Sequence, residues 1–119
     1  MSNLFLCYKG CTTCTKARKH LEASNVEFEN REITVDIPSV EELKTWVKLG
    51  NLDIKTLFNT RGQSYRDLNL KETYDTLSDD ERLALLSKDG MLIKRPLLIT
   101  DSKVLVGYKA SDYDDIKWR

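Results

Sequence analysis

The chain has 119 residues, of which 40% are hydrophobic and 32% are charged. Lysine and arginine number 19 and are balanced by 19 aspartate and glutamate residues. A chain of this size and composition buries a core without disulfide bonds, and we expect a single domain over residues 1–119. The balanced charge lacks the basic field that direct binding of nucleic acid requires.

The sequence also bears on location. No run of apolar residues approaches the length of a membrane span, and the start lacks the pattern of a secretory signal. We therefore expect a cytoplasmic protein, with no membrane association and a monomeric state.

Two of the three cysteines lie in the segment Cys11-Thr12-Thr13-Cys14. In a reducing compartment such a CxxC pair is typical of catalysis, redox sensing or metal binding. Structural zinc takes four soft ligands, and the further candidates here are only Cys7 and His20, so we predict no metal site. A thiol redox role is favoured, and a pair of packed thiols without chemistry is the alternative.

The residues around the motif predict a strand followed by a helix. Residues 4–6 form a short apolar run, and Ala17 and Leu21 lie at helical spacing after Thr12. Cys11 is therefore expected at the N-terminus of the helix, where free backbone N–H groups and the helix dipole favour a thiolate. Cys14 follows one helical turn later.

The residues after this helix complete a parallel unit. Residues 26–33 alternate between apolar and polar, which predicts a second strand. A right-handed crossover makes the two strands parallel and leaves Cys11 at the carboxyl end of the first, where open α/β sheets place their chemistry.

The middle of the chain is predicted to be helical. Ser39 and Glu42 form a capping box before a helix that ends at Gly50, and Ser78 and Glu81 form another before a helix that ends near Gly90. Between them we expect a short helical piece at 51–58 and a turn at 59–64. Residues 65–70 are expected to be irregular or one helical turn, and 71–77 to be a further helical segment. Because no linker or repeat interrupts this region, we interpret 39–90 as an insertion into one domain.

The last part of the chain predicts a hairpin, at 97–100 and 103–107, and a final helix at 111–119. The predicted fold is therefore α/β and thioredoxin-like, with a mixed four-stranded sheet and a helical insertion between the second and third strands. In this arrangement we expect a cis peptide bond at Pro96, in a loop facing Cys11.

Four other side chains are expected to take no direct part in the chemistry. Cys7 lies within the first strand and is expected to be a buried, inert thiol. Lys16 and Arg18 are expected to be solvated helix charges, with stabilisation of a thiolate as the alternative. His20 is expected to be exposed on a polar face of the helix rather than to act as a general base.

Three segments carry a resemblance that covers essentially the whole chain. They are residues 8–21 around the CxxC motif, residues 58–68, and residues 93–98 together with Val106-Gly107. On these segments the chain resembles the arsenate reductase (ArsC) and Spx family of thioredoxin-fold proteins. It is most similar to the small arsenate-reductase-like branch that includes the YffB and YusI proteins.

The resemblance implies roles for individual residues. Arsenate reductases of this family use a cysteine at the position of Cys11 and three arginines that hold the oxyanion, of which Arg95 matches one. The other two positions hold Asn59 and Tyr108, with Arg61 and Lys109 close by in sequence. Fewer charge-assisted contacts are then available to an oxyanion.

Three functions follow as hypotheses. The first is a thiol–disulfide oxidoreductase in which Cys11 attacks and Cys14 resolves, with Arg95, Pro96, Thr12 and Thr13 binding an anion or thiol substrate. It would bind no resident cofactor, take a small thiol or protein disulfide as substrate, and use glutathione or thioredoxin as electron donor. The second is a redox-switched regulator of the Spx type that binds the C-terminal domain of the RNA polymerase α subunit. The third is a true arsenate reductase.

Overall fold

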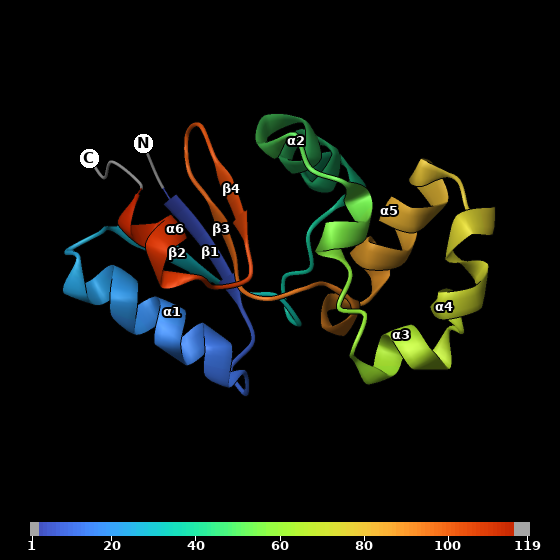
Figure 1. Cartoon of the computed structure of the whole chain (residues 1–119), viewed down its shortest axis with the longest axis horizontal. Coiled ribbons are helices and arrows are strands. Elements are labelled where there is room, and N and C mark those ends of the chain that lie inside the picture. The colour runs from blue at the N-terminus through green and yellow to red at the C-terminus, as the bar shows by residue number, and fades with distance from the viewer. Residues whose placement is uncertain (1–2, 116–119) are drawn as a thin grey trace.

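Four strands form one mixed sheet in the computed structural model, which describes residues 3–115 (Figure 1). They are β1 (Asn3–Cys7), β2 (Phe28–Glu32), β3 (Leu97–Ile99) and β4 (Val104–Val106). The spatial order is β2-β1-β3-β4, in which β1 and β2 are parallel and the other pairs are antiparallel. The predicted mixed four-stranded sheet is confirmed.

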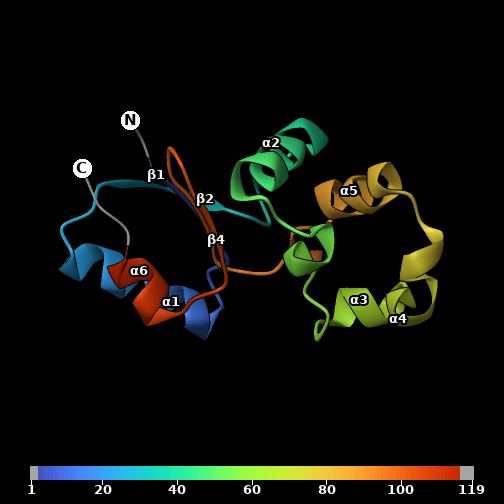
Figure 2. The same cartoon turned by 45° about the horizontal axis from the view of Figure 1, so that its top comes forward.

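The helices divide into two groups (Figures 1 and 2). Beside the sheet lie α1 (Thr12–Ala23) and α6 (Ala110–Asp114). The region between β2 and β3 contains α2 (Val40–Gly50), α3 (Gln63–Asp67), α4 (Leu70–Thr73) and α5 (Asp79–Lys88), with 3-10 turns at Ile54–Leu57, Tyr74–Thr76 and Gly90–Leu92. The helical insertion between the second and third strands is therefore present.

Alternation along β1 separates two apolar clusters, because successive side chains of a strand point to opposite faces. Phe5 and Cys7 pack in one cluster with buried residues of α1 and α6. Leu6 packs in the other cluster, with Leu43 and Trp46 of α2 and with further residues of the insertion. One strand thus joins the layer that carries the CxxC motif to the inserted helices.

Local capping explains why two insertion helices begin where the sequence predicts. The Ser39 hydroxyl accepts a hydrogen bond from the Glu42 N–H (3.1 Å), and the Glu42 carboxylate accepts one from the Ser39 N–H (3.0 Å). Ser78 and Glu81 make the same reciprocal pair before α5. Both predicted capping boxes are confirmed.

Other element boundaries differ from the prediction. The turn expected at 59–64 ends early, because α3 begins at Gln63 with its side chain bonded to Asp67 (2.7 Å). Within 51–58 only Ile54–Leu57 is helical, because the Asp53 side chain caps this short turn. The final helix begins at Ala110, and the predicted part beyond residue 115 lies outside the described residues.

The insertion returns to the sheet at Gly90. A Cβ atom added there would collide with the backbone carbonyl of Ile33, directly after β2. Only glycine lets the two backbones approach so closely. In residues 3–115 no helix has the length and apolar character needed to cross a membrane.

A partly buried ion pair also ties the insertion to the sheet. The Arg31 guanidinium on β2 donates two hydrogen bonds to the Glu42 carboxylate on α2, at 2.7 and 2.9 Å. These bonds lower the pKa of Glu42 to about 2. Asp36 also contacts Arg31, at 3.3 Å, but its side chain is 71% exposed.

We predict that Glu42→Gln destabilises the protein in a pH-dependent way. The ionised carboxylate stabilises the fold above its unfolded pKa of about 4.3, and this contribution is lost as the pH falls toward about 2. Because the carboxylate is 38% exposed and screened by water, we expect a loss of only about 1 kcal/mol at pH 7. Urea unfolding at pH 7, 4.5 and 3 should show the difference from wild type shrink with acid. Asp36→Asn is the matched control, and an equal effect of both substitutions would contradict the prediction.

Candidate functional site

Cys11 lies at the N-cap position of α1, after a short loop from the end of β1. Its N–H donates to the carbonyl of Tyr8 (3.0 Å), and its backbone is extended, with φ −91° and ψ 118°. No side chain caps the first-turn N–H groups of α1. The free N–H groups and the positive end of the helix dipole lie at this end of α1. The position of Cys11 therefore favours a negative charge.

The two cysteines of the motif differ in burial. Cys11 is partly exposed, whereas Cys14 is 1% exposed and packs in the apolar cluster beneath it. Thr12 and Thr13 occupy the first two positions of α1, the former exposed and the latter half-buried. The motif therefore presents one accessible thiol and one that is covered.

The segment before β3 passes beside the same end of the sheet (Figure 1). The Arg95–Pro96 peptide bond is cis, as predicted. Leu97 pairs with Leu6 in the register of β1 and β3, so Pro96 follows next to Cys7. The Pro96 carbonyl accepts a hydrogen bond from the Gly107 N–H (2.8 Å), which joins this segment to the end of β4.

Arg95 has no acidic partner among the described residues. Its Nη1 donates to the carbonyls of Met91 and Ile93, both at 3.2 Å, and its buried Nε has no hydrogen-bond partner within residues 3–115. The guanidinium carbon lies 5.4 Å from the centre of the Tyr8 ring, on the loop that leads to Cys11. In the described part of the chain, no neighbouring carboxylate neutralises its positive charge.

The structure corrects the interpretation of Arg18 as a solvated charge. Its Nη2 donates to Cys7 Sγ (3.4 Å) and to Asn30 Oδ1 (3.2 Å). The spacing from Cys14 to Arg18 is one helical turn, which places both on the same side of α1 and was the available signal. Lys16 is exposed, as expected.

Cys7 is buried as expected, but it is not isolated. Its Sγ donates to the Tyr8 carbonyl (3.6 Å). The interaction with the neighbouring Cys14 side chain and the charge of Arg18 lower the pKa of Cys7, against the opposing effects of burial, Cys11 and Glu32. The interaction with Cys7 and burial raise the pKa of Cys14 well above its usual range. Of these two buried thiols, Cys7 is therefore the easier to ionise.

His20 is not exposed, which corrects the expectation of an exposed side chain at this position of α1. Its side chain is 15% exposed and lies between the Tyr108 hydroxyl and the Asp114 carboxylate, each at 2.8 Å. The sequence pattern missed this because Tyr108 and Asp114 come from the distant β4–α6 region. The contacts fasten α6 to α1.

Tyr113 of α6 closes the same cluster. Its side chain is fully buried, and its hydroxyl has no hydrogen-bond partner among residues 3–115. Burial, together with the charges of Cys14, Tyr108 and Cys7, raises the pKa of Tyr113. A neutral phenol therefore lies close to the buried thiols.

The two positions at which the resemblance places further arginines hold Asn59 and Tyr108, and both residues are engaged in other contacts. Asn59 packs against Gly62, and its N–H donates to the Leu92 carbonyl (2.8 Å). The Tyr108 hydroxyl is bonded to His20. Arg61 and Lys109 are both exposed.

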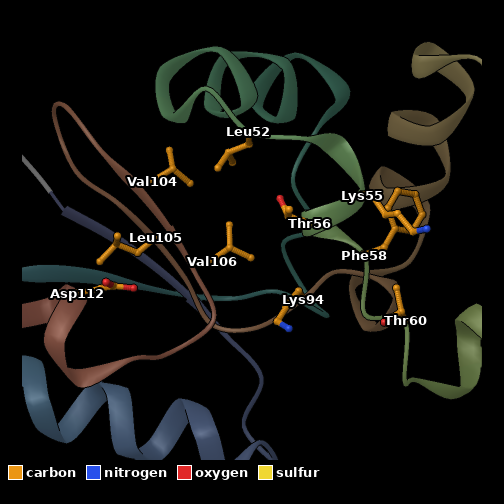
Figure 3. Close-up of a pocket in the computed structure, with 10 residues that line it drawn as sticks. All are labelled: Leu52, Lys55, Thr56, Phe58, Thr60, Lys94, Val104, Leu105, Val106 and Asp112. Atoms are coloured by element: carbon orange, nitrogen blue, oxygen red, sulfur yellow. The ribbon is translucent and has the colours of Figure 1, made fainter.

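A separate pocket of about 490 Å³ lies between β4 and residues 52–60, which follow α2 (Figure 3). Val104 and Val106 line it on one side, Phe58 on another, and Lys55 and Lys94 add positive charge. None of the site residues predicted from the sequence lines it. Within residues 3–115, no three histidine, cysteine or acidic side chains are grouped so as to hold a metal ion.

The sheet order, the cysteine pair at the start of α1 and the cis proline define a thiol redox protein fold of the thioredoxin-like class. Residues 6–116 match the ArsC family, and the chain belongs to that family. It is 47% identical to the uncharacterized protein YusI from Bacillus subtilis, over 97% of this chain and 98% of YusI.

Two further comparisons bear on function. The regulatory protein MgsR from Bacillus subtilis is 32% identical over 91% of this chain and 84% of its own length. The crystal structure of an ArsC-family-related protein from Bacteroides fragilis is 45% identical, covers 98% of both chains and superposes with a TM-score of 0.93. The chain is therefore similar to a regulatory protein and shares its fold with an ArsC-family-related protein.

We predict that a thiol-alkylating reagent modifies Cys11 first in the native, reduced protein. Cys7 and Cys14 are 0% and 1% exposed, so their alkylation should be slower by at least about a hundredfold, since a buried thiol reacts only when the structure opens. Iodoacetamide labelling followed by peptide mass spectrometry measures the three rates. Cys11→Ser should take up almost no label until denaturant is added, and comparable labelling of Cys14 would contradict the prediction.

Proposed function

We propose that the chain is a thiol–disulfide oxidoreductase in which Cys11 attacks and Cys14 resolves. The observation that carries this proposal is the arrangement of the two thiols: Cys11 is accessible at an uncapped helix N-terminus, and Cys14 is covered one turn below it. Such a pair lets a substrate reach the first thiol only. The second thiol is held ready inside.

The reaction has two exchanges. The Cys11 thiolate attacks a disulfide sulfur of the substrate, and one substrate thiol leaves. Cys14 then attacks Cys11 Sγ, releases the second substrate thiol and leaves a Cys11–Cys14 disulfide. A thiol donor, for which we propose glutathione or thioredoxin, returns the pair to the reduced form. The substrate is a small disulfide or a protein disulfide, and we propose that the protein acts as a monomer in the cytoplasm.

Arg95 is the proposed binding group for an anionic part of the substrate. Because no acidic residue within residues 3–115 neutralises it, its guanidinium is available to a carboxylate such as those of glutathione. Thr12 and Thr13 offer backbone N–H groups and hydroxyls at the helix start. Pro96 has no N–H of its own and forms the neighbouring wall.

Arsenate reduction is less well supported. An arsenate oxyanion needs several fixed cationic donors, whereas only Arg95 stands at a matching position. The Tyr108 hydroxyl is bonded to His20, and Arg61 is exposed. We therefore rank thiol exchange above oxyanion chemistry.

We predict that Cys14→Ser traps a mixed disulfide on Cys11 when the protein is treated with glutathione disulfide. Without the resolving thiol, the second exchange cannot occur, and the adduct should persist. Cys11→Ser should form no adduct. Intact-protein mass spectrometry measures the adduct, and trapping partners from cell extract with Cys14→Ser then identifies substrates. Equal trapping by both variants would refute the assigned roles.

A redox-switched regulator is the second candidate function, and it is favoured by the relation to MgsR. In this function the Cys11–Cys14 disulfide would control binding to the C-terminal domain of the RNA polymerase α subunit. The net charge of zero suits a protein partner better than direct contact with DNA.

For this candidate we predict that the purified α-subunit domain binds one redox state at least about tenfold more tightly, a coupling of about 1.4 kcal/mol. Calorimetric titration of the reduced and the oxidised protein measures both affinities. The double variant Cys11→Ser, Cys14→Ser is the control and should bind equally under both conditions. Absence of a complex in either state would exclude the regulator.

A further inference from the structure

The three cysteines form a series that runs from the surface to the interior. Cys11 is partly exposed, Cys14 is covered and Cys7 is fully buried. Cys14 shares an apolar cluster with Cys7, Cys11 packs against that cluster, and the sulfurs of Cys7 and Cys14 both contact the Tyr8 backbone. Cys14 therefore stands between two thiols, and the oxidoreductase proposed above uses only one of them.

We propose that Cys7 is a third redox-active thiol. Cys7 attacks Cys14 in the Cys11–Cys14 disulfide and displaces Cys11. The oxidised state is then stored as a buried Cys7–Cys14 disulfide. This inference rests on the proposed function, because the first disulfide must form through Cys11. It assigns a redox role to the thiol that the sequence presented as inert.

The surroundings of Cys7 suit a nucleophile. Arg18 Nη2 lies 3.4 Å from its sulfur, and a guanidinium at that distance stabilises a thiolate. The same nitrogen also donates to Asn30 Oδ1, which is a neutral group and does not neutralise the positive charge of Arg18. When Cys7 becomes part of a disulfide, Asn30 still accepts a hydrogen bond from Arg18.

The neighbouring elements hold Cys7 in place against Cys14. Cys7 ends β1, beside Pro96 in the register with β3, and Cys14 is fixed by the Tyr8 N–H, which donates to its sulfur (3.4 Å). Tyr113 is buried in the same apolar cluster as Cys7 and Cys14. Both sulfurs contact the backbone of Tyr8, because Cys7 Sγ donates to the Tyr8 carbonyl (3.6 Å) and Cys14 Sγ accepts from the Tyr8 N–H. A disulfide requires the two sulfurs to approach to about 2.05 Å.

The exchange is balanced without any further reactant. The Cys7 thiolate donates an electron pair to Cys14 Sγ, the Cys11–Cys14 bond breaks, and its electron pair leaves with Cys11 as a thiolate. Cys7 is oxidised, Cys11 is reduced, and the number of disulfides stays at one. Cys11 is then free to react again while the oxidised pair is shielded from bulky reductants.

Trypsin separates the two possible disulfides, because it cleaves after Lys9 and Lys16. Cys7 falls in the peptide 1–9, and Cys11 and Cys14 fall together in the peptide 10–16. A Cys11–Cys14 disulfide is internal to the second peptide. A Cys7–Cys14 disulfide joins the two peptides and leaves Cys11 free.

The experiment oxidises the wild-type protein with glutathione disulfide and removes samples over time into denaturant with N-ethylmaleimide. Mass spectrometry of the tryptic peptides should first show the internal disulfide and then the joined peptides, with the maleimide on Cys11. The joined peptides should become the larger species. Cys7→Ala and Cys7→Ser should both retain the internal disulfide, and circular dichroism checks that each variant is folded.

Arg18 provides a second readout. We expect Arg18→Gln to slow the transfer and Arg18→Lys to slow it less. A rise of one pKa unit in Cys7 lowers the rate roughly threefold, because the thiolate fraction falls tenfold while the intrinsic nucleophilicity rises about threefold. Formation of the internal disulfide should keep its wild-type rate in both variants.

The outcomes separate the two proposals. If the internal disulfide forms and the joined peptides never become the larger species, the role of Cys7 is wrong and the oxidoreductase stands. If neither disulfide forms, both proposals fail. If the joined peptides appear while the Cys7 variants form no internal disulfide, Cys11 does not open the pathway, and the transfer from Cys11 is wrong.

Discussion

The junction between the carboxyl end of β1 and the first turn of α1 is the constraint on which the other features depend. Strand alternation directs Phe5 and Cys7 toward α1, and helical spacing returns Cys14 and Ala17 toward the same cluster. Only a short loop lies between them, so Cys11 must stand at the helix N-cap. The reactive position follows from the packing of its neighbours rather than from a dedicated contact of its own.

Two arginines divide the electrostatics of this junction between surface and interior. Arg95 comes from the segment before β3 and lies over the Tyr8 ring, where its charge serves the exposed side. Arg18 comes from α1 and reaches inward to Cys7. A positive charge is therefore available both on the exposed side, from Arg95, and beside the buried Cys7, from Arg18. In the proposed exchange, Cys7 and Cys11 compete for a disulfide with Cys14.

Much of the fold could be predicted because its signals are local. The capping boxes at Ser39 and Ser78 and the run of β1 each depend on residues close in sequence. The short helix α3 was misplaced, because five residues carry too little periodicity and their boundaries depend on tertiary contacts. The cis bond at Pro96 was inferred from the thioredoxin-like arrangement, not from proline itself.

The candidate site was predictable in its nucleophile and less so in its supporting contacts. A CxxC motif can be recognised from its spacing in the sequence, whereas the partners of Arg18 and His20 come from other elements. Helical periodicity gives the face of a residue but not what the tertiary fold brings to that face. Cys7 was judged by its apolar neighbours in sequence, and its cationic neighbour in space could not be seen.

The region after β4 shows how the same framework serves different chemistry. Tyr108 stands where the resemblance places an oxyanion-holding arginine, and its hydroxyl instead joins His20. Asp114 binds the other nitrogen of His20, so that α6 is held against α1 and Tyr113 is kept over the buried thiols. The Tyr108 side chain packs against the cluster that contains Cys7 and Cys14, so this position helps to enclose the buried thiols. Because a tyrosine carries no positive charge, it supplies an oxyanion with none of the charge-assisted hydrogen bonds that an arginine would offer.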